Sequence, residues 1–151
     1  MLPLAEGVPA EHSPERALRW ATEKYASRGA QPAVLGAVLQ LGRCFDLLNE
    51  AITAILAESY RGLVEEYVAK GTSLPENRGP DRKRRNLDCS IINECLDRLR
   101  LRGIEYDTVW GAFLEGDPVY PGAGFSRETH LQVAVRHPSC ILGVFRPNLP
   151  S

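Results

Sequence analysis

The stretch from Tyr120 to Phe145 constrains the fold most, because it joins a loop rich in glycine and proline to two apolar runs that a short turn separates. The first run alternates in polarity, and we therefore expect a strand. Its side chains should point to opposite faces in two sets: Leu131, Val133 and Val135 on one side, and Gln132, Ala134 and Arg136 on the other. The turn at His137-Pro138-Ser139 and the apolar run that follows it predict a second strand.

A candidate binding site precedes the first of these strands. Gly122 and Gly124 give the loop a backbone freedom that suits either a tight entry to the strand or the close approach of a ligand. The polar residues 126–130 then lead to Gln132. A flexible loop followed by convergent polar groups and a rigid strand is a common way of placing a site on a scaffold. The alternatives are that Gln132 is the polar outer face of a half-exposed strand and that His130 is a plain loop histidine.

Three helices are expected elsewhere in the chain. Ser13-Pro14 is a helix start, and the helix should run to about Ser27. Asn49 is a candidate cap for a long helix from Glu50 to Lys70, whose apolar residues recur with the helical period. A third helix should begin at Asn86 or Asp88 and end near Arg102, before Gly103.

These helices, together with the apolar runs, predict an α+β fold. Pro32–Gly42 is a continuous apolar run and reads as a buried strand. A short strand is expected around Val109, followed by a turn at Glu115–Pro118. We expect one small mixed or antiparallel sheet, formed by the regions of Ala33, Val109, Leu131 and Ile141 and covered by the three helices.

Composition limits the classes of function. A chain of 151 residues is most simply a single domain, 1–151, with an irregular start at 1–12 and a flexible polar loop at 72–85. The net charge of −1 implies no general attraction to nucleic acid or to an anionic membrane. No apolar run reaches the roughly 20 residues of a spanning helix, and no secretory signal is evident, so we expect a cytoplasmic protein. The four cysteines lack metal-ligand spacing, which favours reduced thiols and no metal.

Two charged groups have alternative explanations. The basic run Arg82–Arg85 could contact phosphate, but no aromatic residue is interleaved with it, and a solvated charge run is favoured over nucleic-acid binding. Four carboxylates lie close together in the sequence, and one of them could act as a general acid or base, although turn acids usually only solvate a turn. They are Glu105, Asp107, Glu115 and Asp117.

The stretch PGAGFSRETHLQVAVRHPSCILGVF, residues 121–145, resembles the last conserved motif of the ADP-ribosyltransferase superfamily. The resemblance is to the branch with poly(ADP-ribose)-polymerase-like catalytic domains and the small bacterial toxins related to them. In that family a Pro-Gly loop precedes a strand whose first residues include the catalytic carboxylate. The resemblance implies that Gln132 takes the place of this glutamate, and that NAD is contacted by Gly122, Ser126, Thr129 and His130.

A second stretch, AEGVPAEHSPERALRWA at residues 5–21, resembles the middle motif of the same family, in which a glycine-containing strand leads to an alanine-rich helix. Gly7-Val8 and Ser13–Ala21 fit this pattern. Pro9-Ala10 stands where relatives place the aromatic residue that stacks on nicotinamide, and the family's first motif, a histidine on an N-terminal strand, has no counterpart upstream. The comparison implies a partial fold of this family, truncated at its N-terminus or degenerate.

Two functions are therefore open. The first is an ADP-ribosyltransferase that uses NAD as substrate and modifies an intracellular target, as a bacterial toxin does. The second is a catalytically inactive relative that acts as a protein-interaction or toxin–antitoxin-type module, with a cognate antitoxin protein as partner. Cleavage of the nicotinamide–ribose bond passes through an oxocarbenium-like state. The amide of Gln132 can keep a hydrogen bond to the ribose but supplies no negative charge, unless Glu128 or another acid moves in.

Overall fold

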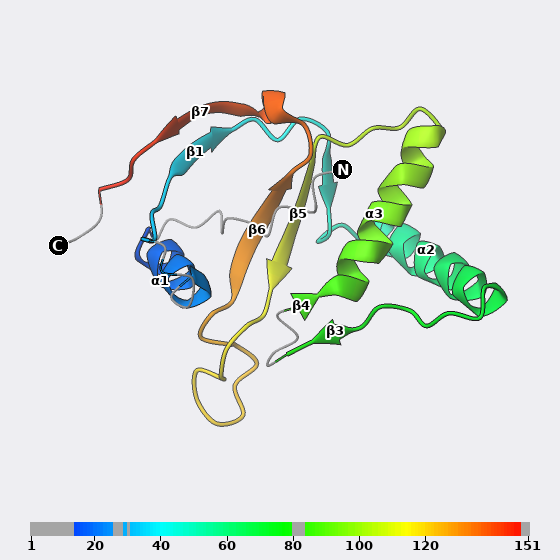
Figure 1. The fold of residues 1–151 in the computed structure, drawn as a ribbon, viewed down its shortest axis with the longest axis horizontal. Coiled ribbons are helices and arrows are strands. Elements are labelled where there is room, and N and C mark those ends of the chain that lie inside the picture. The colour runs from blue at the N-terminus through cyan, green and yellow to red at the C-terminus, as the bar shows by residue number, and fades with distance from the viewer. Residues whose placement is uncertain (1–13, 26–28, 30, 80–83, 149–151) are drawn as a thin grey trace.

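The structure, a computed structural model, describes residues 14–25, 29, 31–79 and 84–148. Its helices are α1 (Pro14–Tyr25), α2 (Glu50–Ala69) and α3 (Asn86–Leu101), with a short 3-10 helix at Pro138–Cys140. Its strands are β1 (Gly36–Leu39), β2 (Cys44–Asp46), β3 (Asn77–Arg78), β4 (Arg84–Arg85), β5 (Thr108–Phe113), β6 (His130–Val135) and β7 (Ile141–Phe145). The expected α+β class is confirmed (Figure 1).

The strands form separate small sheets, and the expectation of one sheet is wrong. β5 is the central strand of a three-stranded mixed sheet, with β2 parallel on one side and β6 antiparallel on the other. β1 and β7 form an antiparallel two-stranded ribbon, and β3 pairs with β4 over two residues. In Figure 1 the ribbon arches away on one side of the mixed sheet, while α2 and α3 lie together on the opposite side.

The core lies between α3 and one face of the mixed sheet. Paired residues of β5 and β6 share a face, and the pair Val109–Ala134 points into this core. Its buried members come from β2, β5 and α3: Phe45, Val109, Ile92, Cys95 and Leu96. Gln132 is two residues from Ala134 and lies on the same face of β6, as the alternation of the sequence predicts.

The helix boundaries follow the sequence closely, but the start of α3 is capped in an unexpected way. The side chain of Asn49 accepts a hydrogen bond from Ala51 N at 2.9 Å, which confirms it as the cap of α2. Neither Asn86 nor Asp88 caps α3. The carboxamide oxygen of Asn77, on β3, accepts from Leu87 N at 3.0 Å and from Asp88 N at 3.3 Å, so a residue ten positions earlier supplies the cap.

The ribbon of β1 and β7 is the most exposed part of the sheet structure. The expectation of a buried strand over Pro32–Gly42 is wrong: only Gly36–Leu39 is a strand, and Val38 is 53% exposed. All five residues of β7 are exposed, including Val144 at 67% and Phe145 at 52%. Among the described elements, β1 and β7 pair as strands only with each other.

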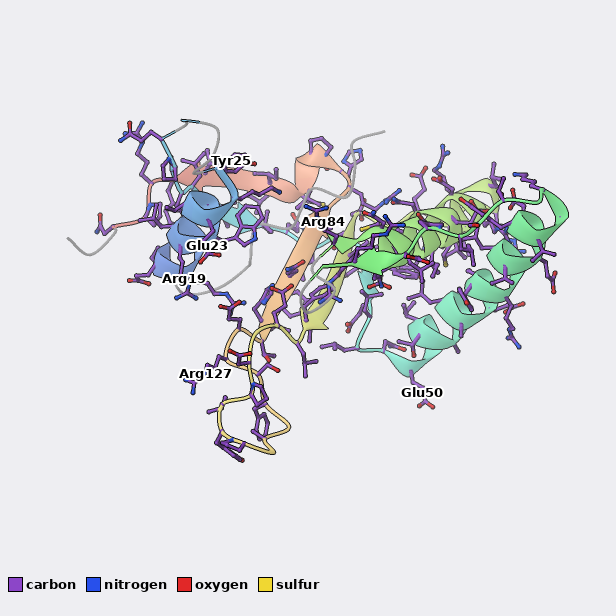
Figure 2. All side chains as sticks on the ribbon, turned by 60° about the horizontal axis from the view of Figure 1, so that its bottom comes forward. Arg19, Glu23, Tyr25, Glu50, Arg84 and Arg127 are labelled. Carbon is purple, nitrogen blue, oxygen red and sulfur yellow. The ribbon has the colours of Figure 1, made fainter. Side chains whose placement is uncertain are left out.

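The connection between β5 and β6 is a long hairpin that projects from the sheet. Glu128 N donates to Glu115 O, and Arg127 N donates to Asp117 O, so the expected turn at Glu115–Pro118 is instead one arm of the hairpin. The turn itself lies further on, where Ala123 N donates to Tyr120 O at 2.9 Å. Figure 2 shows Arg127 on this projecting loop and Arg19 and Glu23 on α1.

Some predicted features lie outside the described residues. These are the irregular start at 1–12, the cap at Ser13, the motif residues Gly7-Val8 and the first part of the basic run, Arg82-Lys83. Within the described ranges, no helix combines the length and the apolar character that crossing a membrane requires.

Candidate functional site

A polar cluster lies at the start of β6, on the face that also carries the core. His130 is opposite Phe113, and Gln132 is opposite Gly111, in the antiparallel register of β5 and β6. The imidazole of His130 is only 6% exposed, whereas Gln132 is half-buried. The side chain of Leu47 lies close to Gly111, where an added Cβ would be 2.9 Å from Leu47 Cδ1.

Hydrogen bonds join these two side chains to the backbone. The amide nitrogen of Gln132 donates to Nε2 of His130. Nδ1 of the same ring lies 2.7 Å from the carbonyl oxygen of Glu128. No described residue donates a hydrogen bond to the amide oxygen of Gln132.

Arg16, on α1, completes the cluster and is a site residue that the sequence reasoning missed. Its guanidinium donates to the carbonyl oxygens of Glu128 and, at 3.4 Å, of Thr129, and its Nη2 atom contacts Nδ1 of His130. These contacts link residues more than 110 positions apart. The available signal was its position in the second stretch of resemblance, at the start of a helix with a proline at its first position.

An aromatic residue connects this cluster to a group of charges. The ring of Phe113 lies 6.2 Å from the imidazole of His130, centroid to centroid, at an interplanar angle of 32°. The guanidinium of Arg85 lies over the ring of Phe113, 4.6 Å from the ring centroid, in a cation–π contact. Arg85 also pairs with Glu115 at 3.7 Å and with Asp88 at 3.6 Å. The last residue of the basic run thus has a structural role.

The structure brings only part of the predicted NAD-contacting set together. Thr129, His130 and Gln132 are neighbours at the start of β6. Ser126 is paired with Pro118 within the hairpin, and Gly122 is in the turn between them, with a positive φ of 81°. Gly122 is therefore at the tip of the projecting hairpin, and Gln132 lies beyond its opposite end, in the sheet.

Two surface hollows lie near these elements. A groove of about 340 Å³ between α2, α3 and the end of β5 is lined almost entirely by apolar side chains: Leu47, Leu56, Ala57, Tyr60, Ile91, Ile92 and Phe113, with Asp88 as the one carboxylate. A second hollow of about 250 Å³ lies between α1 and the segment before β1. Neither is lined by Gln132, but Phe113 borders both the first groove and the ring of His130.

Two of the four candidate carboxylates, Asp107 and Glu115, have structural partners. Asp107 accepts a hydrogen bond from Arg43 N at 2.7 Å, and its carbonyl oxygen accepts from Arg136 N and His137 N, so it ties the start of β2 to the end of β6. Glu115 pairs with Arg85. Neither carboxylate lies beside Gln132 in a described contact.

The four cysteines are free thiols in the structure. Burial raises the pKa of the Cys89 thiol, and the nearby carboxylate of Asp88 raises it further. Burial likewise raises the pKa of the Cys140 thiol. A raised pKa lowers the thiolate fraction, which makes both thiols poor nucleophiles. Among the described residues, no group of three or more histidine, cysteine or acidic side chains is arranged to hold a metal ion.

Comparison of the chain with protein-family models, with curated proteins and with solved structures finds no match in any of the three.

Proposed function

We propose that this chain is an ADP-ribosyltransferase-like domain that binds NAD and transfers ADP-ribose to an intracellular target, with Gln132 at its working edge. One observation supports this proposal above the others. The two stretches that resemble the family, far apart in the sequence, meet through Arg16 of α1 and His130 of β6. A chance likeness in two separate segments gives no reason for them to be in contact.

The hydrogen bonds of the cluster suit a role in holding a sugar. The amide nitrogen of Gln132 contacts Nε2 of His130, so the side chain of Gln132 is oriented before a ligand arrives. Its amide oxygen would then accept a hydrogen bond from a ribose hydroxyl. In the transfer, the bond between ribose carbon and nicotinamide nitrogen breaks, and a bond forms from that carbon to a nucleophilic atom of the target, which loses a proton to water. Gln132 orients the ribose but adds no charge, and we therefore expect slow turnover.

Glu128 does not compensate for the missing charge in the observed arrangement. Its side chain packs against Gly116 in the hairpin, where an added Cβ would lie 2.9 Å from Glu128 Cγ. A Gln132→Glu variant would place a carboxylate at the position where the family keeps one. If the domain is a transferase, this variant should modify itself or a target at least tenfold faster than the unaltered chain, as expected for electrostatic stabilisation of a developing cation.

A thermal-shift titration with NAD tests binding. The unaltered chain should show saturable stabilisation, Gln132→Ala should lose it, and Gln40→Ala, which removes an exposed glutamine outside the cluster, should retain it. Labelled NAD then reports transfer. No shift of the unaltered chain at millimolar NAD would contradict the proposal.

The second candidate is a catalytically silent interaction module, for example one half of a toxin–antitoxin pair. It is favoured by the position of Gly122 at the hairpin tip, because the residues expected to surround NAD are not all gathered around Gln132. In that case Arg16, His130 and Gln132 are a clamp that holds α1 on β6. Loss of stability in Gln132→Ala without any NAD effect in the unaltered chain would favour this second function. A cytoplasmic location is part of either proposal.

A further inference from the structure

Helix α1 depends on its attachment to the rest of the chain. It has 12 residues, and isolated helices shorter than about 12–15 residues are marginal in water. Ala21 is its one buried residue, so little apolar surface holds the helix in place. In Figure 1 α1 lies on the side of the mixed sheet away from α2 and α3. The hydrogen bonds of Arg16 to the carbonyl oxygens of Glu128 and Thr129 are therefore important for its docking.

Both ring nitrogens of His130 face nitrogen atoms of other side chains. Nδ1 contacts Nη2 of Arg16, and Nε2 contacts the amide nitrogen of Gln132. Guanidinium and amide nitrogens are hydrogen-bond donors, whereas a neutral imidazole offers one acceptor nitrogen and an imidazolium offers none. The observed arrangement therefore suits the neutral ring, whichever nitrogen carries its proton. A second proton would leave both contacts without an acceptor.

The two partners of the ring can respond to a second proton in different ways. The carboxamide of Gln132 can rotate by half a turn and present its oxygen to Nε2 of His130. Arg16 has no acceptor to present. Its positive charge would also lie against a second positive charge, on a ring that is only 6% exposed. Protonation of His130 therefore acts on the contact between α1 and β6.

Other charged side chains near His130 are held away from the ring by their own contacts. On the β5 side, the ring of Phe113 lies between the imidazole and Arg85, which pairs with Glu115. Glu128 places its backbone carbonyl oxygen 2.7 Å from Nδ1, while its side chain packs against Gly116 in the hairpin. Arg16 is thus the cation that a protonated His130 would meet in direct contact.

We propose that His130 makes the docking of α1 dependent on pH: the helix is held on β6 while the imidazole is neutral and is released when the ring gains a proton. Histidine side chains ordinarily change charge between about pH 5 and pH 8, so release is expected in that range. The released state accepts the proton more readily than the docked state, and falling pH therefore favours release. Release requires neither NAD nor transfer, so it stands or falls separately from the proposed activity.

Amide hydrogen exchange, measured by mass spectrometry at about pH 7.5 and about pH 5.5, tests the release within this range. After correction for the intrinsic exchange rate at each pH, the protection of the α1 amides should be lower at the acidic pH. The decrease should reach at most about tenfold per pH unit, the limit for one linked proton. The amides of α2, on the other side of the sheet, are an internal reference and should change little.

Substitutions assign the effect to its residues. His130→Gln should abolish the pH dependence, because glutamine gains no proton in this range. The chain has three histidines, and His12→Gln and His137→Gln are controls that should retain it. Arg16→Gln should leave α1 poorly protected at both pH values. Arg19→Gln makes the same change of charge at an exposed position of the same helix and should behave like the unaltered chain.

Three results would overturn the proposal. The first is equal protection of α1 at the two pH values in the unaltered chain. The second is a pH dependence that persists in His130→Gln, and the third is one that disappears in either control histidine variant. If His130→Gln also lowers the protection of α2, so that the whole fold is weakened, Arg16→Gln decides. A pH-dependent loss of α1 protection that persists without Arg16 would contradict the proposed release.

Discussion

The ring of Phe145 lies against the backbone of Gly36, its partner in the antiparallel register of β1 and β7. A Cβ at position 36 would overlap the ring atoms, so the glycine is what allows the aromatic side chain to lie flat across the ribbon.

Gly36→Ala should therefore destabilise the ribbon. We expect the free energy of unfolding in urea to fall by about 1–3 kcal/mol, the usual effect of overpacking. Gly124→Ala is the control, because a side chain there meets nothing within 4 Å. The double variant Gly36→Ala/Phe145→Ala should lose less stability than the sum of the two single changes. Equal effects of the two glycine substitutions would contradict the contact.

Gly42 and Gly71 form a matched pair for a second prediction. Both have left-handed backbones, with φ values of 58° and 62°, but a side chain at position 42 would collide with the carboxylate of Asp107, while one at position 71 meets nothing. Alanine at either position should lower the free energy of unfolding by about 1–2 kcal/mol, because it must adopt the left-handed backbone conformation. Gly42→Ala should lower it by about 1 kcal/mol more, because the displaced Asp107 carboxylate loses its hydrogen bond from Arg43 N. If urea denaturation shows equal losses of stability for Gly42→Ala and Gly71→Ala, the contact of Asp107 with the backbone at Gly42 and Arg43 is contradicted.

Asn77 should be essential to the start of α3. Asn77→Ala removes the acceptor for Leu87 N and Asp88 N and the donor to the carboxylate of Asp88, and we expect a loss of about 1–2 kcal/mol in the free energy of unfolding. Glu76→Ala changes the neighbouring exposed residue and should have little effect. Hydrogen exchange at the first amides of α3 should rise in the Asn77 variant alone.

The reactivity of Cys89 should depend on Asp88. Burial raises the pKa of this thiol, the Asp88 carboxylate adds to the shift, and Arg85 opposes it. Asp88→Asn removes the negative charge, so the pKa should fall and the thiolate fraction at mildly alkaline pH should rise. Iodoacetamide labelling followed by mass spectrometry should then show faster modification of Cys89. Asp97→Asn, further along α3, is the control and should leave the rate unchanged.

The sequence predicts best where local signals agree with tertiary packing. α2 is set by its helical periodicity and by Asn49, and the alternation of β6 correctly groups Gln132 with Ala134, although it does not show that this face is the one that packs on the core. The cap of α3 could not be predicted, because Asn77 is brought to the helix by a two-residue strand pair that has no pattern of its own. β2 was missed for the same reason: three residues are too few to show alternation.

The ribbon and the site show two limits of prediction from sequence: apolar composition does not reveal burial, and residue spacing does not reveal tertiary contacts. Pro32–Gly42 is as hydrophobic as a buried strand, but among the described strands its strand part, β1, pairs only with the exposed β7, so composition alone could not distinguish a core strand from an exposed one. In the site, the contact of His130 with Gln132 is a local one, two residues apart on one strand face. The contribution of Arg16 depends on the tertiary fold and could not be read from spacing.

The attachment of α1 through Arg16 has a consequence for how the chain folds during synthesis. The acceptors of its guanidinium lie 112 and 113 residues later, and so a ribosome must release most of the chain before the first described helix can dock. Until then α1 lacks this attachment to β6, which exposes it to chaperones and proteases for longer than the later elements.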